Sequence, residues 1–246
     1  MPLLRAKGFV LRNRPLGESD RLVTCFTLEH GKIAGVAKGA GKLRSRFGSS
    51  LQSLSLIRLM LFGKETRSLY RIDHTDILTS FQVIRDDWEK LRPALYAIDL
   101  VDALLADADP QPQVFTLLER LLTSVSAGDP ARLDLWLRFF EARLLTLVGY
   151  RPLLERCVIC HRPADAAGAL SGELGGYVCP ACEPEVTDAR RVSPATLRLL
   201  ARTATLPWGA AERVFLSGEQ QQELRQVLHE LLRGHVRKEV KSYRFL

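Results

Sequence analysis

The sequence predicts an α+β protein of several domains, with a small N-terminal β-barrel followed by an all-α helical domain that carries an inserted four-cysteine module. Three observations lead to this prediction. In the segment 1–80, short apolar stretches alternate with polar turns, as in strands, and beyond it apolar residues recur every three or four positions, as in helices. The excess positive charge lies in that same segment. Two C-x-x-C pairs interrupt the helical part.

The segment 1–80 is expected to form strands at 4–12, 22–28, 32–38, 54–61 and 68–75. Between the second and third strands, Glu29, His30 and Gly31 predict a tight turn in which Gly31 adopts a positive φ. Five strands in a segment of this length fit a small closed barrel, and the five-stranded OB-fold is the commonest nucleic-acid-binding barrel of this kind. An SH3-like barrel has a similar length, so the pattern leaves both open.

The helical part begins after Thr79. One helical stripe runs through Trp88, Leu91, Leu95, Ile98, Val101 and Leu105. A helix at 131–148 is apolar nearly all round, which places it at the centre of the core, and Gly149 ends it. A last helix is expected at 218–240, with an apolar face formed by Leu224, Val227, Leu228, Leu231 and Leu232.

These patterns predict three structural parts. The barrel covers 1–80, the helical domain covers 81–153 together with 188–246, and the cysteine module covers 154–187. No apolar run approaches the ~20 residues that span a bilayer, and the N-terminus lacks the apolar segment and cleavage site of a signal peptide. We therefore expect a cytoplasmic protein that does not contact membranes.

The two cysteine pairs are separated by a spacer whose length is typical of a zinc ribbon or knuckle. The segment around them has too few large apolar residues to fold by burial alone. The predicted ligands of one structural zinc ion are Cys157, Cys160, Cys179 and Cys182. A closed four-sulfur site leaves no position for water or substrate. Disulfides are the alternative, but cytoplasmic thiols are kept reduced.

His161 follows Cys160 directly, so this region also matches the C-x-x-C-H pattern of c-type haem attachment. Haem attachment requires export to an oxidising compartment, and it would leave the second cysteine pair without a role. We favour zinc, with His161 outside the ligand set. Cys25 stands alone in an expected strand and is interpreted as a small buried hydrophobe.

The charge is distributed unevenly. The segment 1–80 contains 14 Lys and Arg against six Asp and Glu, whereas the segment 81–246 contains 21 against 22. Positive charge confined to one segment is expected of a module that binds a polyanion, although a solvated basic surface has the same composition.

A glycine-rich stretch at 35–42 invites comparison with a phosphate-binding P-loop. The motif is absent, because Val36 stands at its first glycine and Leu43 at its Ser or Thr. The stretch still offers a flexible backbone and cations to a sugar-phosphate chain. Phe47 is either a ring for base stacking or an anchor in the core. The predicted phosphate contacts are Arg12, Arg14, Lys38, Lys42, Arg44 and Arg46.

Longer motifs carry a family resemblance. In the N-terminal part they are Gly8–Arg12, Leu16–Asp20, Phe26–Lys32, Ala37–Ala40 and Ser45–Gly48. In the C-terminal part they are Phe140–Leu145, Gly149–Pro152, Gly175–Tyr177, both cysteine pairs and Lys241–Leu246. In this order the motifs closely resemble those of the recombination-mediator family RecO, over almost the whole chain.

The resemblance implies an N-terminal OB-fold and a helical C-terminal domain with a zinc module. It also implies a protein that binds single- and double-stranded DNA, anneals complementary strands and, with RecR, helps to load RecA onto DNA coated by single-stranded DNA-binding protein. Such a protein chaperones DNA and catalyses no bond chemistry. Recognition of the acidic, hydrophobic tail of single-stranded DNA-binding protein would need an apolar groove with a basic rim, for which we consider Arg132, Arg138 and Arg143.

Two other functions fit parts of the sequence. A metal-dependent nuclease would use the zinc module to position DNA, but the sequence lacks clustered acidic residues for catalytic magnesium. A zinc-containing transcription regulator would discriminate strongly between DNA sequences at fixed salt, whereas an annealing protein would discriminate little.

Overall fold

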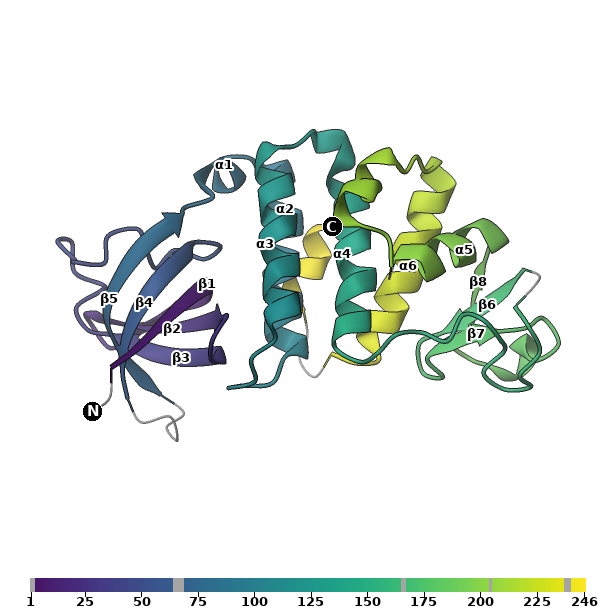
Figure 1. Ribbon diagram of the computed structural model, residues 1–246, viewed down its shortest axis with the longest axis horizontal. Coiled ribbons are helices and arrows are strands. Elements are labelled where there is room, and N and C mark those ends of the chain that lie inside the picture. Colours follow the sequence, from purple (N-terminus) through teal and green to yellow (C-terminus); the bar gives the residue numbers. More distant parts are fainter. Residues whose placement is uncertain (1–2, 64–68, 165–166, 204, 237–239) are drawn as a thin grey trace. The chain divides into compact units, whose positions relative to one another are not determined.

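The computed structural model of the chain describes residues 3–63, 69–164, 167–203, 205–236 and 240–246 (Figure 1). The chain divides into two compact units, one formed by Met1–Ser126 with Val240–Leu246 and the other by Ala127–Glu239. The first helices therefore group with the barrel. The predicted division into three parts, 1–80, 154–187 and the helical residues between and after them, stays a prediction.

Five strands form a closed barrel in the first unit, β1 (Leu3–Leu16), β2 (Asp20–Thr27), β3 (Gly31–Ala37), β4 (Leu56–Phe62) and β5 (Tyr70–Thr79). Their order around the barrel is β1-β2-β3-β5-β4, and β4 pairs back with β1. The β3–β5 pair is parallel, and the other pairs are antiparallel. This arrangement is the OB-fold and confirms the predicted fold class; it is not the SH3-like alternative.

The barrel interior is filled by side chains from all five strands. Among them Val10, Val23, Ile57, Leu59 and Ile72 are at most 1% exposed. Cys25 belongs to the same cluster, which confirms that it is a small buried hydrophobe. Burial raises the pKa of its thiol to about 12, so the thiol stays protonated at neutral pH.

Two phenylalanines connect the barrel to the helices of the first unit. The Phe9 and Phe26 rings, both fully buried, lie 5.0 and 5.7 Å from the ring of Phe115 in α3 (Pro112–Ala127). Burying each ring contributes about 1.5–3 kcal/mol. This apolar contact explains why the barrel and the first helices form one compact unit.

The strand ends differ from the predicted ones, most in β1, which continues to Leu16, and also in β4 and β5. β4 begins at Leu56, because Leu54 is fully buried with a φ of 77° and donates its N–H to the Val10 carbonyl. The predicted start of the fifth strand, Ser68, lies outside the described residues, and β5 continues to Thr79 along β4. The turn before β3 is confirmed, with Gly31 at a φ of 65°.

The other helices of the first unit are α1 (Gln82–Arg85), α2 (Trp88–Leu104) and the short 3-10 helix η4 (Lys241–Phe245). Asp87 caps α2 by accepting the Glu89 N–H. Ile98 and Val101 of the predicted stripe are buried, whereas the Trp88 ring is 55% exposed and contacts Phe245 edge-on.

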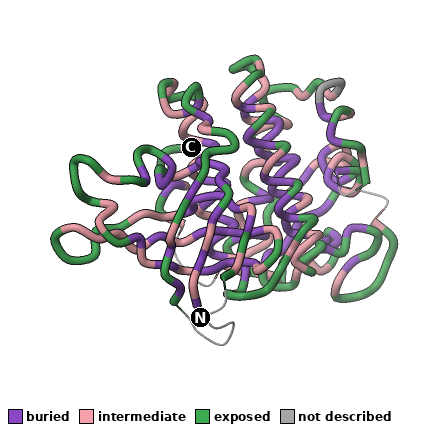
Figure 2. Tube along the Cα trace, turned by 60° about the vertical axis from the view of Figure 1, so that its left-hand side comes forward, coloured by how far each residue is buried: buried purple, intermediate pink, exposed green. Residues whose placement is uncertain are grey.

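The second unit contains η1 (Pro130–Arg132), α4 (Leu133–Leu147), β6 (Gly168–Ser171), β7 (Gly176–Val178), η2 (Glu183–Glu185), β8 (Arg190–Val192), α5 (Pro194–Thr203), η3 (Trp208–Arg213) and α6 (Gly218–Arg233). As predicted, α4 is buried on nearly all sides and lies at the centre of this unit. The three short strands form an antiparallel sheet in the order β7-β6-β8. Figure 2 shows buried residues along the strands and helices and exposed residues in the connecting loops.

The last helix confirms one prediction and corrects another. Its predicted apolar face is buried, and Ser217 with Gln220 forms a capping box at its start. It ends at Arg233, before Gly234, and not at Val240. The terminal segment instead joins the first unit, where the Ser242 hydroxyl donates to Asp99 at 2.6 Å. In the part of the chain that the structure describes, no helix has the length and hydropathy needed to cross a bilayer.

Candidate functional site

A basic loop, residues 38–46, follows β3 and is fixed at both ends. On one side Gly41 donates its N–H to the Ser19 carbonyl at 2.8 Å, and Gly39 donates to the Asp20 carboxylate at 2.8 Å. On the other side the buried Phe47 follows the loop directly. The loop is therefore held against the hairpin between β1 and β2, although it contains no regular secondary structure.

The cations of this loop face solvent. Lys38, Lys42 and Arg44 are exposed, and within the described ranges they form no ion pair. Arg46 is 52% exposed and lies 3.6 Å from the Asp73 carboxylate and 5.0 Å above the Phe47 ring. Three of the loop's charges are thus exposed and unbalanced among the described residues, and the fourth is partly balanced by Asp73.

Phe47 itself is only 4% exposed and belongs to the barrel core. The base-stacking interpretation is therefore wrong, and the ring is the core anchor. Ser50 strengthens this anchor, because its hydroxyl donates to the Phe47 carbonyl and lies 2.6 Å from the Thr75 hydroxyl.

The two arginines of β1 differ in their surroundings. Arg14 is exposed and lies across from Leu22 in β2. Arg12 is half-buried and forms an ion pair with Asp102, whose carboxylate is buried and also lies 3.6 Å from the Lys32 ammonium. Lys32 in turn donates to the Asp102 and Leu105 carbonyls at the end of α2. Arg12 therefore has a structural partner that sequence patterns did not predict.

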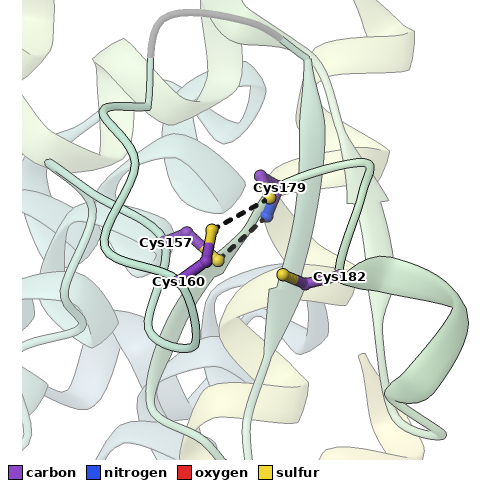
Figure 3. Close-up of side chains that lie close together, drawn as sticks. All are labelled: Cys157, Cys160, Cys179 and Cys182. Atoms are coloured by element: carbon purple, nitrogen blue, oxygen red, sulfur yellow. Dashed lines mark hydrogen bonds between the residues drawn. The ribbon is translucent and has the colours of Figure 1, made fainter.

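The four cysteines come together in the second unit (Figure 3). All four sulfurs lie within 4.8 Å of one another, and those of Cys160 and Cys179 are 3.6 Å apart. A disulfide would require about 2.05 Å. A tetrahedron with Zn–S bonds of about 2.3 Å has sulfur–sulfur edges of about 3.8 Å. The cluster therefore has the dimensions of a four-sulfur metal site, and the cysteines are free thiols.

Each C-x-x-C pair forms a tight turn that is tied to the small sheet. In the first turn the His161 N–H donates to the Cys157 carbonyl, and in the second the Cys182 N–H donates to the Cys179 carbonyl. Val158 donates to the Tyr177 carbonyl in β7 at 2.8 Å. The His161 side chain is exposed. Since both pairs contribute to one cluster, the arrangement favours a metal site over haem attachment.

The protonation of the cluster depends on its neighbours. Burial raises the pKa of Cys157, but N–H groups of Cys160, Cys179 and Ile159 donate to its sulfur and bring that pKa down to about 6. Burial and hydrogen bonds with the other three thiols raise the pKa of Cys182 to about 12. Four thiolates this close repel one another, so a bound cation is needed for all of them to ionise together.

A groove of about 760 Å³ lies beside α5 in the second unit. Its lining is largely apolar and includes Leu199, Val214 and Phe215, and the Phe215 ring is 84% exposed. Arg198 and Arg202, one helical turn apart on α5, are exposed at its edge. Their i, i+4 spacing was visible in the sequence, but the burial that forms the groove was not.

The three arginines considered for a basic rim separate in the structure. Arg132 lies beside the groove, with its guanidinium 5.1 Å from the Phe215 ring centre. Arg138 is completely buried and pairs with the buried Glu141, so its assignment to a rim is wrong. Arg143 donates to the Thr203 carbonyl at the end of α5.

Taken together, an OB-fold barrel with an exposed basic loop and a helical part with a four-thiol cluster define a protein of the oligonucleotide-binding barrel class. Residues 1–81 match the family described as Recombination protein O N terminal, and residues 85–244 match Recombination protein O C terminal. The chain belongs to the RecO family of DNA repair proteins.

Several curated relatives are named DNA repair protein RecO, and each matches this chain over nearly its whole length. The DNA repair protein RecO of Symbiobacterium thermophilum is 35% identical over 251 residues, which covers 100% of this chain and 97% of the relative. That of Geobacter metallireducens is 36% identical over 249 residues, covering 100% and 98%. That of Myxococcus xanthus is 34% identical over 240 residues, covering 97% and 95%.

Proposed function

We propose that this protein is a cytoplasmic, nucleoid-associated recombination mediator that binds single- and double-stranded DNA and anneals complementary strands. With RecR as its partner, it helps to load RecA onto DNA coated by single-stranded DNA-binding protein. The observation that carries the proposal is the anchored basic loop on an OB-fold barrel, in a chain of the RecO family. Lys38, Lys42 and Arg44 provide the principal phosphate contacts, with Arg14 and Arg46 beside them and Arg12 held mainly by Asp102.

The proposed mechanism depends on the positive charge of the basic loop, and no covalent bond is made or broken. Complementary strands repel each other through their phosphates, and a cationic loop that displaces counterions lowers the cost of bringing them together. Hydrogen-bond donors and acceptors of the bases stay available for pairing, because the loop contacts the backbone. This is the reason for proposing that the protein is not an enzyme.

We further propose zinc as the occupant of the cysteine cluster. Cys157, Cys160, Cys179 and Cys182 would hold the ion, and four thiolate donors at these distances fit zinc well. A zinc ion with four sulfur ligands supplies structural cross-linking and no catalysis. It would join the two C-x-x-C turns to the sheet of β6, β7 and β8, a segment with little apolar core of its own.

Reversing two charges of the basic loop tests the DNA assignment. Lys42→Glu together with Arg44→Glu should weaken binding to single-stranded DNA by about tenfold or more at low salt. The dependence of log K on log salt should become shallower by about 1.4, since each lost phosphate contact removes about 0.7. Fluorescence anisotropy with a labelled oligonucleotide at several salt concentrations measures both quantities.

The matched control carries the same change of net charge elsewhere on the barrel. Arg5 and Arg58 are exposed residues of β1 and β4, so Arg5→Glu with Arg58→Glu should leave most of the salt dependence intact. Annealing of strands precoated with single-stranded DNA-binding protein should slow in the loop variant and not in the control. Equal salt slopes in the two double variants would contradict the assignment.

We propose the groove beside α5 as the binding site for the acidic, hydrophobic tail of single-stranded DNA-binding protein. Charge complementarity supports this occupant, because Arg132, Arg198 and Arg202 lie around an apolar floor. The apolar residues of such a tail would cover Phe215, and its carboxylates would face the arginines.

The tail assignment predicts a local effect of charge. Arg202→Glu should weaken binding of a labelled tail peptide by about tenfold, because it replaces a cation at the edge of the groove by a carboxylate that repels those of the tail. The matched control is Arg151→Glu, because Arg151 is another exposed arginine of the same unit. This variant should change the affinity for the peptide little. Fluorescence anisotropy of the peptide measures both. Equal losses in the two variants would indicate nonspecific attraction and reject the groove as the site.

A further inference from the structure

The tip of the basic loop carries an apolar side chain. Leu43 lies between the exposed cations Lys42 and Arg44, and its own relative exposure is 104%. No other large hydrophobic side chain in the described ranges is as exposed, the next being Phe215 at 84%. A leucine presented wholly to water, inside a group of cations, has no packing role in this unit.

We propose that Leu43 is an apolar wedge that enters between neighbouring bases when the basic loop grips DNA. This inference rests on the proposed DNA contact of the loop. Leucine is among the side chains that proteins insert between base steps, where it partly unstacks them. The cations on either side would hold the sugar-phosphate chain on both flanks of the inserted side chain.

The loop is built to present this residue outward. Before the tip, Gly41 approaches the β1–β2 hairpin so closely that an added Cβ would lie 3.2 Å from the Ser19 carbonyl oxygen. The Lys42 N–H donates to the Gly39 carbonyl at 3.2 Å, which closes a turn. After the tip, Phe47 is fixed in the barrel core. Because both ends of the loop are held, ordering the tip when DNA binds costs less conformational entropy than it would in a free loop.

The proposed insertion has a consequence for annealing. A single strand stacks and folds on itself, and bases in that state are poorly presented to a complementary strand. A wedge that separates one base step, next to cations that neutralise the phosphates, would keep the bases splayed and accessible. The same side chain would give the protein a preference for single strands and frayed ends over intact duplex, since an unpaired step costs less to open.

The test uses a single-stranded oligonucleotide with one 2-aminopurine, whose fluorescence rises when its neighbours unstack. At saturating full-length protein, the wild type should raise the signal and Leu43→Ala should lose most of that rise. Because the cost of unstacking offsets the wedge contact, affinity should fall only about two- to fivefold, with an unchanged salt slope. Leu43→Met should retain the rise. The control is Leu3→Ala, because Leu3 is an exposed leucine at the end of β1 that lies away from the β1–β2 hairpin.

The outcomes separate this inference from the proposed function. If Lys42→Glu with Arg44→Glu weakens DNA binding while Leu43→Ala leaves the fluorescence rise intact, the loop binds DNA and the wedge is rejected. If the charge variant has no effect, the DNA contact of the loop fails and the wedge fails with it. If Leu43→Ala alters RecR binding and leaves the DNA signal unchanged, Leu43 belongs to a protein interface and the proposal is overturned.

Discussion

Replacing Cys157 by serine is expected to release the proposed zinc ion and to unfold the segment from the first cysteine pair to β8. Cys157 is fully buried, and its sulfur accepts the Cys179 N–H at 3.4 Å, so it connects both halves of the cluster. Structural zinc contributes about 10–16 kcal/mol in small zinc-dependent domains. The three short strands around the cluster cannot replace that contribution. Chelation of the wild-type protein should have the same effect.

Two measurements check this expectation. Metal analysis should give one zinc ion per wild-type chain and much less for Cys157→Ser, and hydrogen exchange should show lost protection in β6 and β7, whose ladder amides are otherwise bonded. Cys25→Ala is the matched control, since that thiol is in the barrel core and outside the cluster. A full equivalent of metal bound to Cys157→Ser would contradict the prediction.

The same site predicts a dependence on pH. Zinc binds thiolates, so protons compete with the ion and metal release should increase as the pH falls. DNA affinity of the chelated protein should stay close to that of the native protein, because the basic loop lies in the other compact unit. A large loss of DNA binding on chelation would show that the metal does more than fold its own segment.

The second large effect is expected at an ion pair inside α4. The Arg138 guanidinium and the Glu141 carboxylate are 2.8 Å apart, and both side chains are completely buried. Glu141→Leu would leave the arginine charge in the core without its main partner, and among the described residues Asp134 at 3.5 Å is the other carboxylate paired with it. Removing one member of such a pair costs about 3–5 kcal/mol. Hydrogen exchange of α4 amides in increasing urea reports this loss for the second unit alone.

The double variant Arg138→Met with Glu141→Leu provides the control. Two apolar side chains of similar volume can replace a buried pair at little cost, so most of the stability should return. Equal destabilisation by the single and double variants would show that the ion pair is not the source of the effect.

Several features followed from the sequence because they depend on local patterns. Alternating and helical periodicities predicted a five-stranded barrel and the buried helix α4, and the Gly31 turn appeared as expected. The two C-x-x-C pairs predicted a cluster of four sulfurs, since each pair needs only a short turn to align its own two thiols. Motifs spread along the chain also indicated the RecO family correctly.

Other features depended on partners that are distant in sequence. Phe47 could have faced solvent on local grounds, but the barrel core buries its ring. Arg138 pairs with Glu141 one turn along the same helix, but its burial depends on the distant helices that pack around α4. Arg12 was predicted as a phosphate contact, and only the fold placed Asp102 of α2 beside it. The last helix ends at Arg233, and the terminal segment from Val240 joins the first unit.

The sequence by itself determined the five barrel strands and the buried helix α4, which residues could bind a metal and where the positive charge is concentrated. The tertiary structure decided which of those charges remain available. It buried Arg138, paired Arg12 and left Lys38, Lys42 and Arg44 exposed on an anchored loop. The physical reason is that propensity and periodicity act over a few residues, whereas burial and charge pairing depend on which distant segments fold against each other.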